Sequence, residues 1–282
     1  MVSKVKINHQ NRKGTRVLAH RPPLTPLSQK RSQVTMFIII GILIVVLILL
    51  FFLLRGDLKP EINKKTNFDP ETYVDLCLED DLTESLKVIS SQGGYILSNL
   101  TINYGGKNVA YLCYNINNYQ RCINQEPLFL RHLQEEIHDD IEDELKDCFL
   151  DLKDRLEKEN FESDITVNDI TFDVELIPDR VIIKINNEFY IEKDGERRKL
   201  ENIKVVKISK YYDLANTVQE IVSQESWFCN FEQTGYMVLY PDYDIEKFRT
   251  GDSSTIYSVK HKTTNEEFIF AVRGCGIPPG IG

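Results

Sequence analysis

A run of nineteen uncharged residues, 36–54, limits what this chain can fold into more than any other feature of its sequence. The run reads MFIIIGILIVVLILLFFLL, and Gly41 is its only interruption. As an α-helix it would be about 28 Å long, close to the roughly 30 Å hydrocarbon core of a bilayer. A helix satisfies its own backbone polar groups in lipid, whereas a lone strand does not. The run therefore predicts a transmembrane helix.

The balance of charge changes sign across this run. Residues 1–35 hold eight Lys or Arg and no Asp or Glu, whereas the residues after the run hold 26 basic and 43 acidic side chains. Because positive residues favour the cytoplasmic side of a membrane, we predict a single-pass signal anchor in the cell membrane. Its N-terminus would be cytoplasmic and its C-terminal domain extracytoplasmic, with Lys30, Arg31 and Arg55 flanking the lipid. A cleaved signal would need a small-residue site, but Arg55 opens the sequence that follows.

The chain divides into five predicted segments. These are a basic cytoplasmic tail (1–35), the transmembrane helix (36–54), a linker (55–70), a disulfide-bearing α+β ectodomain (71–275) and a flexible tail (276–282). The net charge of −9 argues against nucleic-acid binding by bulk charge. We expect the lipid bilayer as one partner and an envelope or surface protein as the other candidate. The oligomeric state is left open.

All six cysteines follow the apolar run. An even number of cysteines on the outer side of a membrane favours disulfides, and six cysteines allow fifteen pairings. Zinc is disfavoured because no C-x-x-C motif occurs and no His stands at ligand spacing from a Cys. Buried free thiols are the remaining alternative. The positions of the inferred elements favour one pairing, namely Cys77 with Cys148, Cys113 with Cys122, and Cys229 with Cys275.

The pattern of hydrophobic residues predicts an α+β ectodomain with a largely antiparallel sheet and two or three packed helices. The expected helices cover residues 71–92, 127–159 and 212–224. The expected strands are 95–103, 108–114, 165–177, 181–187, 189–193, 203–208, 235–240, 255–260 and 268–273. The helix over 127–159 has an apolar stripe along an otherwise acidic surface, so we expect it to pack against its own sheet.

No catalytic motif is present: the sequence lacks G-x-S-x-G, H-E-x-x-H and phosphate-binding glycine loops. We therefore expect no cofactor and no metal, and favour a binding or structural protein over an enzyme. His132 and His138 lie six residues apart and are interpreted as part of a solvated helix face. Trp227-Phe228 follows an amphipathic helix, which favours core packing over an exposed contact patch. Asn99-Leu100-Thr101 is a glycosylation sequon that the predicted location permits.

Two segments carry a resemblance to known proteins. Residues 30–41, KRSQVTMFIIIG, and Cys77 followed by the QGGYI sequence at 92–96 resemble uncharacterised single-pass membrane proteins from small-genome archaea. A second helix with a cysteine, here Cys148, also follows in those proteins. The resemblance covers about residues 30–180 and implies a membrane-anchored protein that faces the cell surface. It carries no catalytic assignment.

Two alternative functions stay open. The basic leader is also similar to that of archaeal pilin-like proteins, which would imply processing near Gln33 and assembly into a filament. Pilins normally carry Glu at the fifth position of the mature helix, where this chain has Phe37, and that difference argues against filament assembly. The second alternative is an anchored extracellular hydrolase.

Overall fold

The computed structural model describes residues 32–54 and 68–277. It contains two compact units, residues 1–66 and 67–282. The predictions for most of the basic tail, the linker and the flexible tail fall outside the described residues, as do Lys30, Arg31 and Arg55. We call the second unit the α+β unit.

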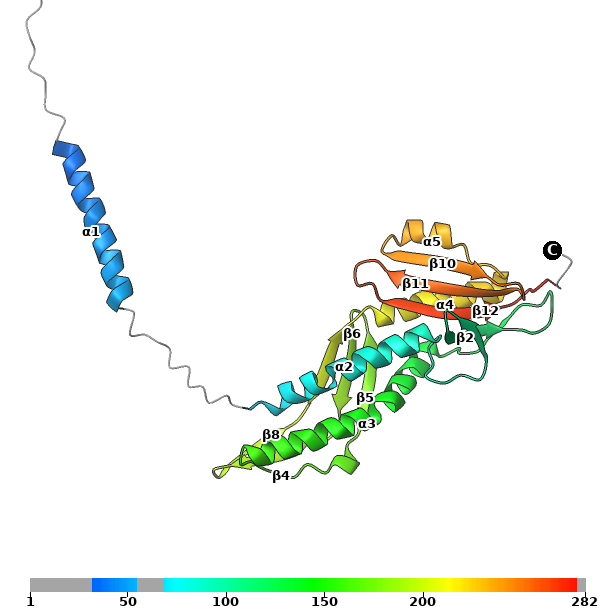
Figure 1. Ribbon diagram of the computed structural model, residues 1–282, viewed down its shortest axis with the longest axis horizontal. Helices are drawn as coiled ribbons and strands as arrows, with labels where there is room; N and C mark the ends of the chain where they lie inside the picture. Colours follow the sequence, from blue (N-terminus) through cyan, green and yellow to red (C-terminus); the bar gives the residue numbers. More distant parts are fainter. Residues whose placement is uncertain (1–31, 55–67, 278–282) are drawn as a thin grey trace, which may run out of the picture. The chain divides into compact units, whose positions relative to one another are not determined.

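The first unit contains one described helix, α1 (Ser32–Leu54), shown in blue in Figure 1. The side chains described in α1 are those of residues 36–48 and 50, and all of them are exposed. Among the described residues, no helix combines the length and the apolar character that crossing a membrane requires. Membrane insertion of residues 36–54 therefore stays a prediction.

The α+β unit confirms the predicted fold class. Its helices are α2 (Pro70–Ser91), α3 (Phe129–Lys158), α4 (Tyr211–Phe228) and α5 (Gln233–Leu239). Its strands are β1 (Thr101–Tyr104), β2 (Lys107–Tyr114), β3 (Ile123–Asn124), β4 (Glu162–Ser163), β5 (Phe172–Ile177), β6 (Arg180–Ile185), β7 (Phe189–Lys193), β8 (Glu196–Leu200), β9 (Lys204–Ile208), β10 (Tyr243–Arg249), β11 (Ser254–His261) and β12 (Glu267–Arg273).

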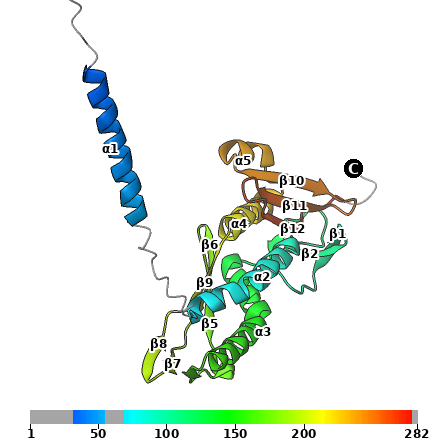
Figure 2. The same cartoon turned by 60° about the vertical axis from the view of Figure 1, so that its left-hand side comes forward.

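The strands form three sheets. The largest has the order β1-β2-β12-β11-β10, with β3 added beside β2, and β12 pairs with β2 in parallel. The other two have the orders β4-β7-β8 and β5-β6-β9. All pairings except β12 with β2 are antiparallel among the described strands. The largest sheet lies at one end of the unit, as Figures 1 and 2 show.

Local chemistry explains where α2 begins and ends. The Asp69 carboxylate accepts a hydrogen bond from the backbone N–H of Thr72 at 3.4 Å, and Pro70 occupies the first turn, where it needs no donor partner. Gly93 and Gly94 follow the helix with φ of +83° and +93°. A Cβ on Gly93 would lie 2.9 Å from the backbone nitrogen of Ala110, so this turn leaves no room for a side chain.

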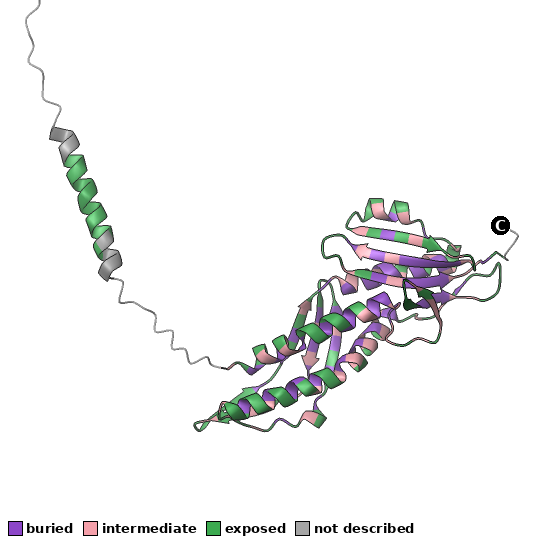
Figure 3. Ribbon diagram, viewed as in Figure 1, coloured by how far each residue is buried: buried purple, intermediate pink, exposed green. Residues whose placement is uncertain are grey.

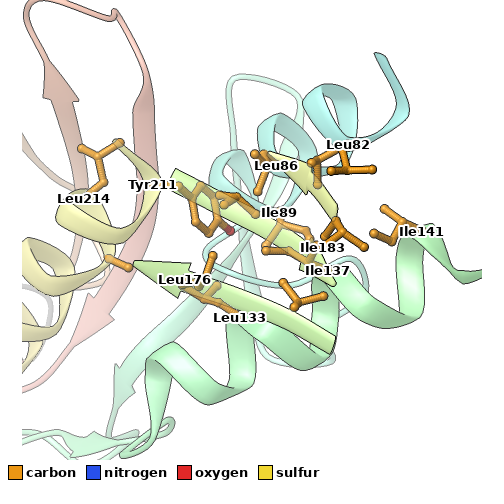
Figure 4. Packing of buried hydrophobic residues seen from close by; sticks show 14 of the residues in the cluster. Leu82, Leu86, Ile89, Leu133, Ile137, Ile141, Leu176, Ile183, Tyr211 and Leu214 are labelled. Atoms are coloured by element: carbon orange, nitrogen blue, oxygen red, sulfur yellow. The ribbon is translucent and has the colours of Figure 1, made fainter. Parts of the chain in front are cut away.

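The core joins α2, α3 and α4 to the sheets. Buried positions recur along α2 and α3 in Figure 3, because three- and four-residue steps place these side chains on one helix face. Figure 4 shows Leu86 and Ile89 of α2 and Leu133 and Ile137 of α3 around the same space as Tyr211. Burial of these apolar side chains supplies most of the stability of such a layered unit.

Several element predictions are wrong. Of the expected strand 95–103, only residues 101–103 form a strand, within β1. Of the expected strand 165–177, only residues 172–177 do, as β5, because a 3-10 turn covers Val167–Asp169.

Residues 235–239 of the expected strand 235–240 belong to helix α5, and Tyr240 is the residue that caps its C-terminal end. The rings of Tyr236 and Tyr240 lie 4.6 Å apart between their centroids. Strands β8 and β10 and the two-residue strands β3 and β4 were not predicted. The packed helices of the α+β unit number four among the described residues, rather than two or three, because α5 adds a short one.

Candidate functional site

The six cysteines form three disulfides with the pairing that the sequence favoured. Cys77 of α2 bonds Cys148 of α3, and Cys113 of β2 bonds Cys122, closing a short loop. The third bond joins Cys229, just after α4, to Cys275, just after β12. The bonds fix the packing of two helices and the loops at one end of the largest sheet.

The other residues singled out by the sequence lie apart from one another. Asn99 is exposed in the segment between α2 and β1, and its glycosylation stays a prediction. His132 is packed rather than solvated: its Nε2 lies 2.9 Å from the Gly94 carbonyl oxygen, and its side chain is 14% exposed. His138 stacks on Phe172, with ring centroids 4.2 Å apart. Among the described residues, no group of three or more His, Cys, Asp or Glu is placed to hold a metal ion.

A groove of about 410 Å³ lies between α2, the start of α4 and the turn that joins β11 to β12. Its volume falls within the range of small-molecule sites in proteins. Leu86, Leu214 and Ile269 contribute apolar surface. The charged residues of the lining are of both signs, namely Lys87, Lys107, Lys207, Glu266 and Glu267. The groove is therefore large enough for a small molecule, and its mixed charges favour neither an acidic nor a basic ligand.

A buried ionic cluster connects α4 to β10 and β11. Glu225 is 8% exposed in its side chain, and its Oε1 accepts hydrogen bonds from the Tyr257 hydroxyl, from the Phe231 N–H at 3.1 Å and from Lys247 Nζ at 3.2 Å. Lys247 Nζ also donates to Asn230 Oδ1 at 3.0 Å. Burial and the adjacent Glu225 carboxylate raise the pKa of Tyr257. Each of these buried polar groups has a hydrogen-bond partner inside the cluster. The arrangement indicates a cluster that stabilises the fold rather than an open catalytic site.

Three segments far apart in sequence meet at the end of the unit that carries two disulfides. We call residues 115–123, 226–230 and 274–277 the tip. The Tyr119 N–H donates to the Gly276 carbonyl at 2.9 Å, and the Asn115 N–H donates to the Arg273 carbonyl at 2.8 Å. The Cys229–Cys275 bond adds the end of α4 to this assembly.

The tip exposes an unusual number of large apolar side chains. Their exposed fractions are 69% for Ile116, 64% for Tyr119, 67% for Ile123, 64% for Trp227, 75% for Phe228 and 51% for Ile277. The expected core packing of Trp227-Phe228 is therefore wrong. The apolar stripe of α4 buries Val218, Ile221 and Val222, whereas the last turn of the helix directs Trp227 and Phe228 into solvent.

The comparisons with known proteins give no relative. No family model matches the chain, and no curated protein or solved structure is detectably similar to it.

Sequence reasoning missed most of the tip and all of the ionic cluster. A signal for the cluster existed, because Glu225 follows Val218, Ile221 and Val222 on the apolar stripe of α4. A carboxylate in such a position needs a buried partner. Ile116, Ile123 and Ile277 gave no comparable signal, because each is a single apolar residue in a loop or a two-residue strand.

Proposed function

We propose that this chain is a single-pass, membrane-anchored surface protein whose α+β unit lies outside the cytoplasm and has a binding role. One observation carries the proposal: all six cysteines follow the apolar run, and all six are paired in disulfides. Disulfides persist in oxidising compartments and are rare in the cytosol. The basic leader and the apolar run supply the matching anchor and orientation.

The surface of the α+β unit supports binding over catalysis. The groove is large enough for a small ligand, and the three segments of the tip expose six large aromatic and aliphatic side chains. Exposed apolar patches on soluble domains typically mark interaction surfaces. The buried Glu225, by contrast, already binds three donors from the protein.

The location can be tested with single added cysteines in the full chain. Leu97 is 88% exposed in the α+β unit, and Ser3 lies in the basic tail. We expect a membrane-impermeant maleimide to label L97C in intact cells and S3C only after permeabilisation. The wild-type chain, whose own cysteines are paired, should show background labelling alone.

Labelling of S3C in intact cells, with L97C protected until permeabilisation, would refute the proposed orientation. Non-reducing electrophoresis checks that each variant keeps the wild-type mobility, so that the added thiol reports location rather than rearranged disulfides.

A further inference from the structure

Strand β10 forms one edge of the largest sheet, where Figures 1 and 2 show it with α5 next to it. At one end of its ladder with β11, the Thr250 N–H donates to the Ser254 carbonyl at 2.9 Å. At the other end, the Lys262 N–H donates to the Asp242 carbonyl at 2.9 Å. Because bonded pairs alternate along an antiparallel ladder, the even-numbered residues of β10 bond β11. The odd-numbered residues direct their backbone groups away from β11, to the free side of the strand.

Helix α5 covers only the first part of this free side. The Ile245 N–H donates to Met237 Sδ of α5 at 3.2 Å. Further along the strand, the backbone N–H and C=O groups of Lys247 and Arg249 have no hydrogen-bond partner among the described residues. We call residues 247–249 the free stretch of β10. Unpaired backbone groups at a sheet edge are the groups to which an extended segment of another protein can bond as an added strand.

A hollow of about 360 Å³ adjoins the free stretch, and Lys247 and Phe248 contribute to its lining. Phe248 is 53% exposed, and its ring lies 5.8 Å from the ring of Tyr104 between centroids. Gln233 lines the same hollow, and its Oε1 is buried without a hydrogen-bond partner among the described residues. The free stretch therefore has space, an exposed aromatic ring and an unsatisfied acceptor beside it.

The charges of the free stretch favour a partner segment over a second copy of this chain. Antiparallel pairing of two copies through the free positions would place Lys247 or Arg249 opposite one of the same two residues of the second copy. Like charges directly opposite each other destabilise a sheet. Lys247 already binds Glu225, whereas Arg249 is exposed and belongs to none of the ion pairs among the described residues. A strand that brings a carboxylate to Arg249 therefore fits this edge best.

We propose that the free stretch of β10 binds an extended segment of a partner protein, which joins the largest sheet as an additional antiparallel strand. The segment carries a carboxylate beside Arg249, an apolar side chain beside Phe248 and a basic side chain beside Glu246, which is exposed. Backbone hydrogen bonds supply the affinity, and the alternating side chains supply the specificity. The proposal rests on the binding role proposed above but not on the anchoring or the orientation of the chain.

A labelled peptide tests the added strand. The probe is the fluorescein-labelled octapeptide Thr-Thr-Glu-Val-Thr-Lys-Thr-Thr, whose Glu, Val and Lys would lie opposite Arg249, Phe248 and Glu246. Its binding to the full chain in mild detergent is followed by fluorescence anisotropy. In the added strand, the backbone groups of the glutamate and of the threonine after the valine would face β10. Those of the valine and the lysine would face solvent.

Two N-methylated forms of the peptide separate strand addition from other modes of binding. Methylation of the glutamate and of the following threonine should weaken binding about 30-fold, because two backbone hydrogen bonds to β10 are lost. Methylation of the valine and the lysine should change the affinity by less than about twofold, because these N–H groups face solvent in the added strand. Both peptides are used with the wild-type chain, so this comparison does not depend on how any variant folds.

Matched variants identify the edge. Arg249→Pro removes an N–H on the free side of β10, where proline leaves the ladder with β11 intact, and should weaken binding about 30-fold. Arg249→Ala keeps the N–H and loses only the charge, so we expect a loss of about threefold. Asn103→Pro makes the same backbone change on β1, at the opposite edge of the sheet, and should bind the peptide as the wild type does. Far-UV circular dichroism checks that each variant is folded.

The proposal fails in any of four cases. The parent peptide binds more weakly than about 1 mM; the two N-methylated peptides bind equally well; R249P and N103P bind equally well; or the wild-type chain self-associates without peptide and R249P does not. The last result would assign the free stretch to a second copy. The maleimide labelling of L97C and S3C decides the location of the unit independently, so the location and the added strand can fail separately.

Discussion

Glu225→Ala should lower the free energy of unfolding of the α+β unit by about 3–5 kcal/mol, the cost of leaving a buried charge without its partner. Lys247, whose side chain is 12% exposed, would lose its carboxylate, and the Tyr257 hydroxyl and the Phe231 N–H would lose their acceptor. Urea unfolding of the full chain in mild detergent, followed by far-UV circular dichroism, measures the change.

Two further variants show whether the ion pair causes this loss. Glu246→Ala removes an exposed carboxylate from the position next to Lys247 on β10 and should change stability by less than about 0.5 kcal/mol. E225L/K247M removes both charges and should recover most of the loss, because apolar replacements spare the cost of burying ions. An E225A variant as stable as E246A would show that the cluster contributes nothing to the fold.

Cys77→Ser should cost about 4 kcal/mol, because the disulfide with Cys148 spans 71 residues and restricts the unfolded chain accordingly. Cys148→Ser and the double variant should cost the same amount, since either change alone breaks the bond. Cys113→Ser, which opens a separation of nine residues, should cost about 3 kcal/mol. The same unfolding measurement gives all four values, and additive losses for Cys77 and Cys148 would mean that the two do not form a bond.

Helices and strands whose apolar residues recur at regular spacing could be predicted from the sequence. Helix α3 repeats apolar residues on one face for 30 residues, so its register is unambiguous. Apolar residues also recur at every second position in β5 and β6, and the structure buries these positions. The hairpin that joins the two strands was expected around residues 178–180. The disulfide pairing followed from these elements, because Cys77 and Cys148 were both placed on packed helices.

The missed elements depend on tertiary contacts. Strand β8, with the sequence ERRKL, buries only Leu200 and is fixed by pairing with β7 and by Arg197 lying over the ring of Tyr190. Strand β10 buries only Ile245 and is fixed by pairing with β11. Neither has an apolar pattern of its own. The tip could not be predicted for a related reason: its three segments meet only after two disulfides and the sheet bring them together.

The central claim, an anchored protein with a disulfide-bearing unit outside the cytoplasm, is tested most directly by intact mass and a non-reducing peptide map of the full chain from native membranes. We predict an intact N-terminus and three intramolecular bonds that pair Cys77 with Cys148, Cys113 with Cys122, and Cys229 with Cys275. Six free thiols would contradict the extracytoplasmic location. A mature chain that begins near Gln33 would contradict the signal anchor and favour a processed filament subunit instead.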